Sequence, residues 1–123
     1  MQKKYIQAEI INIGDELLIG QIVNTNASMI ASQLNTIGIM VECVTTIGDK
    51  KQDIESAFSN ALNKYDIVFV TGGLGTTNDD ITKECICNYF NTQLVENQQI
   101  KKHIADLCQE RHYKVSETIY SQA

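Results

Sequence analysis

The segment Asp66–Thr82, DIVFVTGGLGTTNDDIT, decides the predicted fold of this chain. Residues 67–71 are apolar and β-branched or aromatic without alternation, a pattern typical of a strand that is buried on both faces of a parallel sheet. Gly72, Gly73 and Gly75 follow, and glycine permits backbone conformations and close approaches that a Cβ forbids. A helical pattern begins directly after this turn. The segment therefore predicts a strand, a glycine-rich turn and a helix N-terminus in succession.

Two carboxylates, Asp79 and Asp80, stand between the glycine turn and the helical pattern. The free N–H groups and the dipole of a helix N-terminus favour an anion, so a strand, turn and helix in this order suit a phosphate group. Carboxylates beside such a turn would repel bare phosphate, which predicts a divalent cation, Mg²⁺ or a similar ion, between them. The spacing matches neither G-x-G-x-x-G nor a P-loop, so neither of these nucleotide motifs is indicated.

Composition limits the class of protein. The 123 residues suffice for one domain, or part of one, and 43% hydrophobic content is ordinary for a globular chain. The net charge is −5, with 10 Lys and Arg against 15 Asp and Glu, and no basic run offsets it, so nucleic acid is not an expected partner. No stretch is apolar enough for a membrane span or a signal sequence, so no membrane partner is expected either. We therefore expect a cytoplasmic protein.

The four cysteines do not suggest a metal site. Cys43, Cys85, Cys87 and Cys108 show no C-x-x-C spacing, and in a reducing compartment they are expected to be buried as small apolar side chains. Cys108 and His112 share a helical face, but two ligands do not make a zinc site.

Strands and helices alternate along the sequence, which predicts a parallel sheet with helices on both faces. Leu17–Asn24 carries no clear pattern. The expected strands are 8–13, 39–47 and 67–71, with a short edge strand at 92–95; the expected helices are 27–37, one through Ile54–Leu62, one after Asp80, 97–111 and the start of one in 114–123.

Cap residues are expected at several helix ends. Asn24, Thr25 and Asn26 are alternative N-caps of helix 27–37, and Gly38 is expected to end that helix. Asp49 with Gln52 three residues later fits a capping box. Apolar residues at helical spacing define the inward faces. These are Ile30, Leu34 and Ile37; Ile54, Ala57, Phe58, Ala61 and Leu62; Ile86, Tyr89 and Phe90; and Ile100, Ile104, Leu107 and Cys108.

Three turns that each follow a strand carry the candidate site. Ligands of parallel α/β sheets bind beyond the carboxyl ends of the strands, and all three turns open on that edge. We therefore expect their carboxylates to surround one crevice: Asp15, Glu16, Asp49, Asp79 and Asp80. Simpler interpretations are open for each: a solvated turn for the first pair, a helix cap for Asp49 or Asp79, and a first-turn acid for Asp80.

Three long stretches carry a family resemblance: GDELLIGQIVNTN (14–26), LNTIGIMVECVTTIGD (34–49) and TGGLGTTNDDIT (71–82). They resemble the molybdopterin-binding domain family, and most closely the N-terminal domain of CinA-like, competence/damage-inducible proteins. The resemblance covers essentially the whole chain. It implies a three-layer α/β/α sandwich with a mostly parallel sheet.

The resemblance also implies roles for particular residues. Asp80, helped by Asp79, would be catalytic, and the metal ligands would be Asp80, Asp79 and Asp15. Nucleotide and phosphate would be bound by Gly72, Gly73, Gly75, Thr71, Thr82, Asp49 and Glu16. The expected ligand is a small nucleotide or a molybdopterin-like molecule, and the expected assembly is a homo-oligomer, a dimer or trimer.

The activity implied by this branch is metal-dependent hydrolysis of ADP-ribose or a similar nucleoside diphosphate derivative. Molybdopterin adenylyl transfer is one alternative, and a non-catalytic nucleotide-binding or assembly module is another. Two departures from the family pattern stand out. Thr76 replaces a proline of the turn, and the chain ends at Gln122-Ala123, before the family's last strand and loop. The domain is therefore expected to be incomplete at its C-terminus.

Overall fold

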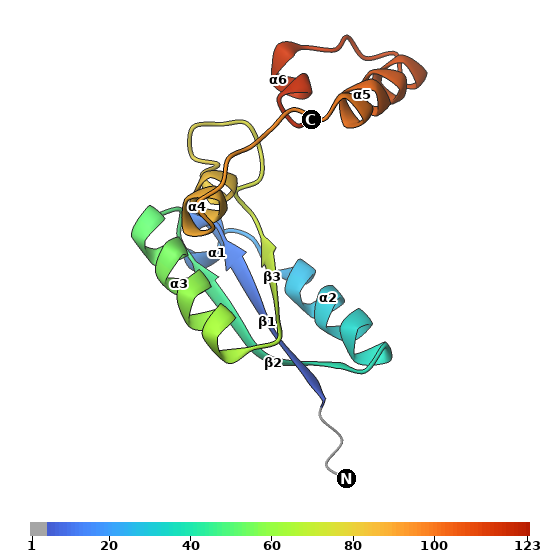
Figure 1. Ribbon diagram of the computed structural model, residues 1–123. Coiled ribbons are helices and arrows are strands. Elements are labelled where there is room, and N and C mark those ends of the chain that lie inside the picture. The colour runs from blue at the N-terminus through green and yellow to red at the C-terminus, as the bar shows by residue number, and fades with distance from the viewer. Residues whose placement is uncertain (1–4) are drawn as a thin grey trace.

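A computed structural model, which describes residues 5–123, contains three strands and six helices in that range (Figure 1). The strands are β1 (Ile6–Ile13), β2 (Ile39–Ile47) and β3 (Ile67–Thr71). The helices are α1 (Asp15–Leu18), α2 (Thr25–Thr36), α3 (Lys51–Lys64), α4 (Thr82–Tyr89), α5 (Gln98–Glu110) and α6 (Glu117–Tyr120).

The three strands form one parallel sheet in the order β2-β1-β3. The central strand β1 is buried from Ala8 to Ile13, as its nearly continuous apolar sequence predicts. Ile10 of β1 pairs with Val44 of β2 on one side and with Phe69 of β3 on the other. Because all three strands run in the same direction, their carboxyl ends meet at one edge of the sheet. The sequence predicts the ligand site at this edge.

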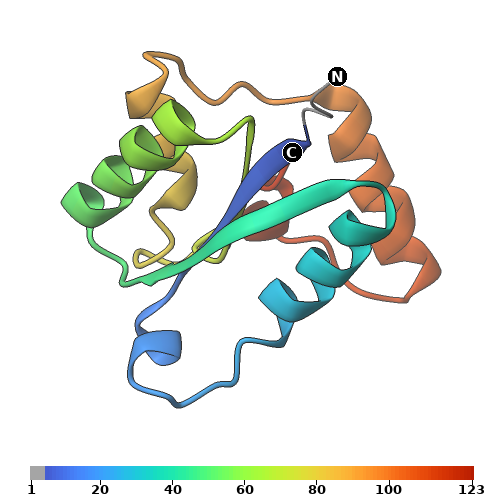
Figure 2. The ribbon, with the colours of Figure 1, turned by 90° about the horizontal axis from the view of Figure 1, so that it is seen from below.

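Helices cover both faces of the sheet, which confirms the three-layer α/β/α prediction. Helix α2 packs on one face, mainly against β2, while α3 and α4 pack against each other on the opposite face (Figures 1 and 2). The main apolar core lies between the sheet and the α3–α4 pair. Its buried members are Ile11, Ile13, Ile54, Phe58, Ala61 and Cys85.

Helix α2 begins and ends close to the predicted residues. Of the three alternative N-caps, Asn24 takes the role, since its side-chain oxygen accepts the Ala27 N–H at 3.2 Å. Gly38, with φ of +83°, follows the helix in the left-handed region that favours glycine. Leu34 is buried as predicted, but Ile37 is exposed because the helix stops at Thr36.

The capping box predicted for Asp49 and Gln52 is wrong. Lys50 is the N-cap of α3, and no side chain accepts a hydrogen bond there. The Asp49 carboxylate instead accepts a hydrogen bond from the backbone of Asp15, in the turn after β1. The predicted inward face of α3 is confirmed for Ile54, Phe58 and Ala61, and wrong for the exposed Leu62.

Two capping interpretations after the glycine turn are also wrong. Helix α4 begins at Thr82 with Ile81 as its N-cap and no side-chain cap, so Asp79 does not cap it and Asp80 lies before its first turn. At the end of α4, the expected inward residues are only partly covered. Phe90 is exposed, whereas the Tyr89 ring packs edge-on to the Phe58 ring with centroids 6.3 Å apart.

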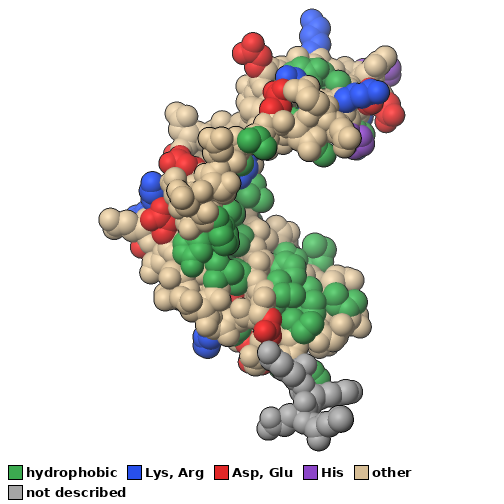
Figure 3. Space-filling model, in the orientation of Figure 1, with side chains coloured by type: hydrophobic (Ala, Val, Ile, Leu, Met, Phe, Trp, Pro, Cys, Tyr) green, Lys and Arg blue, Asp and Glu red, His purple; other side chains and the backbone are tan. Residues whose placement is uncertain are grey.

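Strand β3 is less buried than predicted. All five of its residues are only half-buried, because β3 is the edge strand of the described sheet and pairs only with β1. A hollow lined by apolar side chains lies beside it, and Figure 3 shows apolar side chains exposed over this part of the α3–α4 layer. The lining residues are Phe58, Leu62, Val68, Val70, Ile86 and Phe90.

The C-terminal segment, residues 91–123, differs most from the predictions. Residues 92–95 form no strand. Helix α5 forms almost as predicted, but it contains no buried residue. The expected inward position is wrong for Ile100 and Leu107, which are exposed, whereas Ile104 and Cys108 are half-buried. Figure 1 shows α5 and α6 standing away from the sheet, on the far side of the glycine turn.

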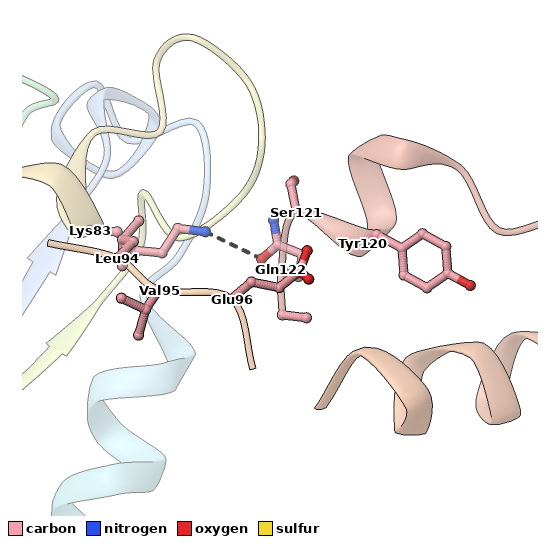
Figure 4. A pocket seen from close by; sticks show the side chains of 8 residues that line it. Lys83, Leu94, Val95, Glu96, Tyr120, Ser121 and Gln122 are labelled. Carbon is pink, nitrogen blue, oxygen red and sulfur yellow. Dashed lines mark hydrogen bonds between the residues drawn. The ribbon is translucent and has the colours of Figure 1, made fainter. Parts of the chain in front are cut away.

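The C-terminal segment is held mainly by its own contacts. The Asn97 N–H donates to the Ala123 carbonyl at 2.8 Å, and the Lys101 ammonium lies 5.2 Å from the Tyr120 ring centroid. Figure 4 shows a contact with α4, in which the Lys83 ammonium approaches Gln122 Oε1 at 3.5 Å.

Of the cysteines, Cys85 is buried as predicted, and burial raises the pKa of its thiol. The prediction is wrong for Cys43, Cys87 and Cys108, which are half-buried. Within residues 5–123, no helix is long and apolar enough to cross a membrane.

Candidate functional site

The turns after β1, β2 and β3 meet around one crevice with a volume of about 430 Å³. This volume falls within the range of about 300–1,000 Å³ that is usual for small-molecule sites. All five predicted carboxylates line it. The complete lining is Ile13, Gly14, Asp15, Glu16, Asp49, Gly73, Thr77, Asp79 and Asp80.

Two reciprocal hydrogen bonds join the turns after β1 and β2. The Asp15 N–H donates to Asp49 Oδ2 at 3.1 Å, and the Asp49 N–H donates to Asp15 Oδ1 at 3.3 Å. The Gly14 N–H also donates to the Ile47 carbonyl at 2.9 Å. Each carboxylate is therefore held in place by the backbone of the opposite turn. Glu16 lies one residue further on, in the first turn of α1.

The three glycines of the turn after β3 serve different purposes. Gly72 has φ of +87°, and a Cβ there would overlap the Ile13 carbonyl, so this glycine lets the turn pack against β1. Gly73 has φ of +62° and lines the crevice. A Cβ on Gly75 would lie 2.6 Å from Asp80 Oδ2. Gly73 is thus the one that offers its bare backbone to the crevice, while Gly72 and Gly75 shape the turn.

Thr82, the first residue of α4, is fully buried behind Gly73. Its N–H donates to the Gly73 carbonyl at 3.2 Å, and a Cβ on Gly73 would overlap its Oγ1. Within residues 5–123, Thr82 Oγ1 has no hydrogen-bond partner although it is buried. Buried hydroxyls are usually paired, so this atom is an unused hydrogen-bonding group directly behind the glycine turn.

Asp80 closes the loop between the glycines and α4. Its Oδ2 accepts hydrogen bonds from the Thr77 N–H at 3.0 Å and from the Thr77 hydroxyl at 2.5 Å. These hydrogen bonds, together with weaker contributions from the Gly75 backbone and from Lys83, hold the pKa of the Asp80 carboxyl below its ordinary value. Asp80 is therefore kept as a carboxylate that faces the crevice.

Not every predicted site residue reaches the crevice. Thr71, Gly72, Gly75 and Thr82 are not part of its lining, and the Thr71 hydroxyl donates to Asn12 Oδ1 at 2.9 Å. Sequence reasoning missed Thr77 and Asn12. The spacing Thr77-x-x-Asp80 is a signal for Thr77, because such short polar spacings form local turns. Asn12 gives a weaker signal, as a single amide in an apolar strand.

The crevice has a strongly acidic lining with no lysine or arginine. Carboxylate oxygens are the ligands that Mg²⁺ and similar hard cations prefer, so the donor set fits such an ion in its chemistry. The carboxylates are not gathered into a ready-made site, because in residues 5–123 no three His, Cys, Asp or Glu side chains are placed to hold a metal ion together. Asp80 in particular is already engaged by Thr77.

A parallel α/β sheet with a glycine turn and acidic turns at its carboxyl edge defines a class of small-molecule-binding α/β domains. Within that class, residues 9–122 match the family model described as "probable molybdopterin binding domain". The chain belongs to this family, as the sequence resemblance indicated.

Relatives with assigned names agree with the CinA-like branch. A CinA-like protein of Flavobacterium psychrophilum is 47% identical over 105 residues, which is 85% of this chain and 25% of that protein. A CinA-like protein of Cytophaga hutchinsonii is 44% identical over 103 residues, 84% of this chain and 25% of that protein. The chain thus spans about a quarter of the length of these curated relatives.

Solved structures share the fold. The structure of CinA, a protein of unknown function from Thermoplasma acidophilum, matches with a TM-score of 0.76 and 29% identity, over 94% of this chain and 67% of that one. MoaB of Pyrococcus furiosus, a tungsten cofactor synthesizing protein, matches with a TM-score of 0.65 and 21% identity, over 97% of this chain and 68% of that one. At that identity the second match is evidence for the fold alone.

Proposed function

We propose that the acidic crevice binds a nucleoside diphosphate derivative together with a divalent cation and hydrolyses its pyrophosphate linkage, with ADP-ribose as the substrate. The observation that carries this proposal is that five carboxylates and the bare backbone of Gly73 line one crevice at the carboxyl ends of parallel strands. This is the position at which sheets of this kind bind nucleotides.

The charge of the crevice supports the requirement for a cation. A diphosphate would enter a site with no basic side chain in its lining, and like charges a few ångströms apart repel strongly where water is partly excluded. Asp80, Asp79 and Asp15, which are not yet gathered around one point in the described residues, would draw together to hold the cation. When bound, it would neutralise charge that develops on the phosphoryl oxygens and lower the pKa of an attacking water.

The other residues of the site would bind and orient the substrate. The bare backbone of Gly73 would approach a phosphate group, and the dipole of α4, which begins directly behind Gly73, favours an anion there. Asp49 and Asp15 hold the first two turns together through their reciprocal hydrogen bonds, and Glu16 is available for a ribose hydroxyl. The hydrogen bonds from Thr77 keep Asp80 ionised.

Molybdopterin adenylyl transfer is the second candidate. The family model, described as a probable molybdopterin binding domain, favours it. Adenylyl transfer and pyrophosphate hydrolysis both involve a nucleotide phosphate and a cation, so the acidic crevice suits either reaction. A non-catalytic nucleotide-binding or assembly module is a third possibility. Assembly into a homodimer or homotrimer and a cytoplasmic location also belong to the proposal.

Phosphorus NMR of the protein with ADP-ribose and Mg²⁺ tests the activity directly. The expected products are AMP and ribose 5-phosphate, and Asp80→Asn should abolish their formation because it removes the carboxylate charge. Asp106→Asn is the matched control, since Asp106 is an exposed acid on α5, outside the crevice lining.

Three outcomes contradict parts of this proposal. Equal turnover by Asp80→Asn and wild type would overturn the role of Asp80. Binding without turnover would favour the non-catalytic module. Transfer of AMP from added ATP to added molybdopterin, with release of pyrophosphate and with ADP-ribose left intact, would favour the adenylyl transferase.

A further inference from the structure

The side-chain amide of Asn12 joins all three strands just behind the crevice. Asn12 lies on the central strand β1 and is fully buried. Its Nδ2 donates to the Thr45 carbonyl of β2 at 3.3 Å, and its Oδ1 accepts the Thr71 hydroxyl of β3 at 2.9 Å. A buried amide costs free energy unless it is hydrogen-bonded. Both the Nδ2 and the Oδ1 of Asn12 are hydrogen-bonded.

Each partner of this contact stands next to a turn of the crevice. Asn12 directly precedes Ile13 and Gly14, and Thr71 directly precedes the glycine turn. Thr45 lies two residues before Ile47, whose carbonyl accepts the Gly14 N–H. The contact therefore ties the starting points of the three turns to one another.

The residue type is unusual for its position. Ile10, Ile11 and Ile13, its neighbours on β1, are all buried and apolar, so burial alone would be served by another isoleucine. Apolar contacts are non-directional, whereas a fully satisfied buried polar contact specifies one arrangement of the groups it joins. An amide that bonds both neighbouring strands restricts how far they can shift past one another.

We propose that Asn12 is a positioning residue for the phosphate turn. It holds the glycine turn in register with the Gly14–Glu16 turn, so that the carboxylates on opposite sides of the crevice face one ligand. Thr71 acts through Asn12 in the same way, which replaces its predicted role as a direct phosphate ligand. The ligand in this inference rests on the proposed function, but the positioning can be measured without any ligand.

The experiment compares wild type with Thr71→Val, which removes the hydroxyl at nearly constant shape, and Thr71→Ser, which retains it. Amide hydrogen exchange of Thr82, whose N–H donates to the Gly73 carbonyl, and of Gly14 reports the order of the two turns in the ligand-free protein. Calorimetric titration of ADP in the presence of Mg²⁺ reports binding. Urea unfolding confirms that each variant is folded under the conditions of both measurements.

Thr71→Val should speed exchange at the Thr82 N–H and weaken ADP binding about ten-fold, the size expected for loss of one hydrogen bond that leaves Asn12 Oδ1 unpaired. Thr71→Ser should stay within about two-fold of wild type, since the donor is restored.

Asn12→Asp gives a second readout, because its effect should depend on pH. An ionised aspartate cannot donate to the Thr45 carbonyl, whereas a protonated one can, and burial favours the protonated form. ADP affinity of this variant, relative to wild type at the same pH, should therefore recover as pH is lowered. A role in stability alone would not produce that recovery under conditions where both proteins are folded.

The inference is overturned if Thr71→Val lowers the urea midpoint but leaves both the Thr82 exchange and the ADP affinity as in wild type. If wild type binds no ADP with Mg²⁺, the proposed function fails, and the exchange at Thr82 and Gly14 alone decides the positioning role. Faster exchange in Thr71→Val than in Thr71→Ser then supports it, and equal exchange overturns it.

Discussion

Residues 5–90 and residues 91–123 both contain well-formed helices, but they bury very different amounts of apolar side chain. Helix α3 places Ile54, Phe58 and Ala61 in the core, whereas α5 has no buried residue. Both helices carry apolar residues at helical spacing. Helix formation follows local signals, but most helical stability in proteins comes from packing of the apolar face.

The N-caps of α2 and α5 show the same contrast between local structure and packing. Asn24 caps α2 and Asn97 caps α5, each by accepting backbone N–H groups of the first turn. The local geometry is alike, yet α2 packs against β2 while α5 contacts mainly α6. The differences that follow from this contrast can be measured.

The largest contrast is expected for isoleucine truncation. Ile54→Ala should lower the free energy of unfolding by about 2–5 kcal/mol, because Ile54 is fully buried and the change leaves a cavity. Ile100→Ala should lower it by less than about 1 kcal/mol, because the Ile100 side chain is already 45% exposed. Urea unfolding followed by circular dichroism measures both. Equal losses would contradict the difference in packing.

Alanine substitutions at two glycines separate the cost of backbone strain from the cost of steric overlap. Gly20→Ala places a Cβ in open space at φ of +72°, so only backbone strain of about 1–2 kcal/mol is expected. Gly72→Ala adds an overlap with the Ile13 carbonyl at φ of +87° and should destabilise the fold by clearly more. The same urea experiment tests this order. A Gly72→Ala variant as stable as Gly20→Ala would mean that the turn after β3 does not pack tightly against β1.

The two helix caps should respond in different ways. Asn24→Ala should lower the free energy of unfolding of the main transition by about 1 kcal/mol, the usual cost of losing an N-cap. Asn97→Ala should leave that transition almost unchanged and instead speed amide exchange at Gln99 and Ile100, whose N–H groups lose their acceptor. A drop in the main transition for Asn97→Ala would show that the C-terminal segment unfolds together with the sheet.

The smallest effect concerns the two carboxyl groups with lowered pKa. Neutral donors on Thr77 lower the pKa of Asp80, whereas Lys101, followed by Gln98, lowers that of Glu96. Salt of about 1 M screens charges, so it should move the pKa of Glu96 toward its ordinary value and leave that of Asp80 almost unchanged. Carbon NMR titration of the carboxyl groups tests this. Equal salt responses would contradict the two causes.

The lowered pKa of Asp80 also fixes how the stability of its loop depends on pH. Because the pKa of Asp80 is lowered from its ordinary value of 3.8, its hydrogen bonds stabilise the loop above that pH and are lost as pH falls through the lowered pKa. Amide exchange at the Thr77 N–H should therefore be slower in wild type than in Asp80→Asn at neutral pH. The exchange rates of the two proteins should become equal in strong acid. No difference at neutral pH would contradict the role of Asp80 in closing the loop.

The positions of the three strands, and the edge of the sheet that their turns share, could be predicted from the sequence. Residues 8–13, 39–47 and 67–71 were predicted as strands, and their turns as one acidic edge, because parallel strands place their carboxyl ends together. The structure brings Asp15, Glu16, Asp49, Asp79 and Asp80 to that edge. Their roles in binding and catalysis stay predictions.

Features that depend on tertiary partners were not predicted. The Asp49–Gln52 spacing satisfies a local rule, but the Asp49 carboxylate bonds a turn that is 34 residues away in the sequence. The apolar face of α5 obeys a helical period, which cannot reveal whether anything covers it. Asn12 was passed over because its hydrogen bonds reach Thr45 and Thr71 on other strands, and sequence patterns within one strand carry no trace of them.

We propose that the acidic crevice binds a nucleoside diphosphate derivative only together with a divalent cation. Calorimetric titration of ADP-ribose into the protein, with Mg²⁺ and then with EDTA, tests it most directly. Binding is expected with Mg²⁺ and is expected to be lost with EDTA, and it should be lost in Asp80→Asn but not in Asp106→Asn. Equal affinity with and without the cation, or full affinity in Asp80→Asn, would contradict it.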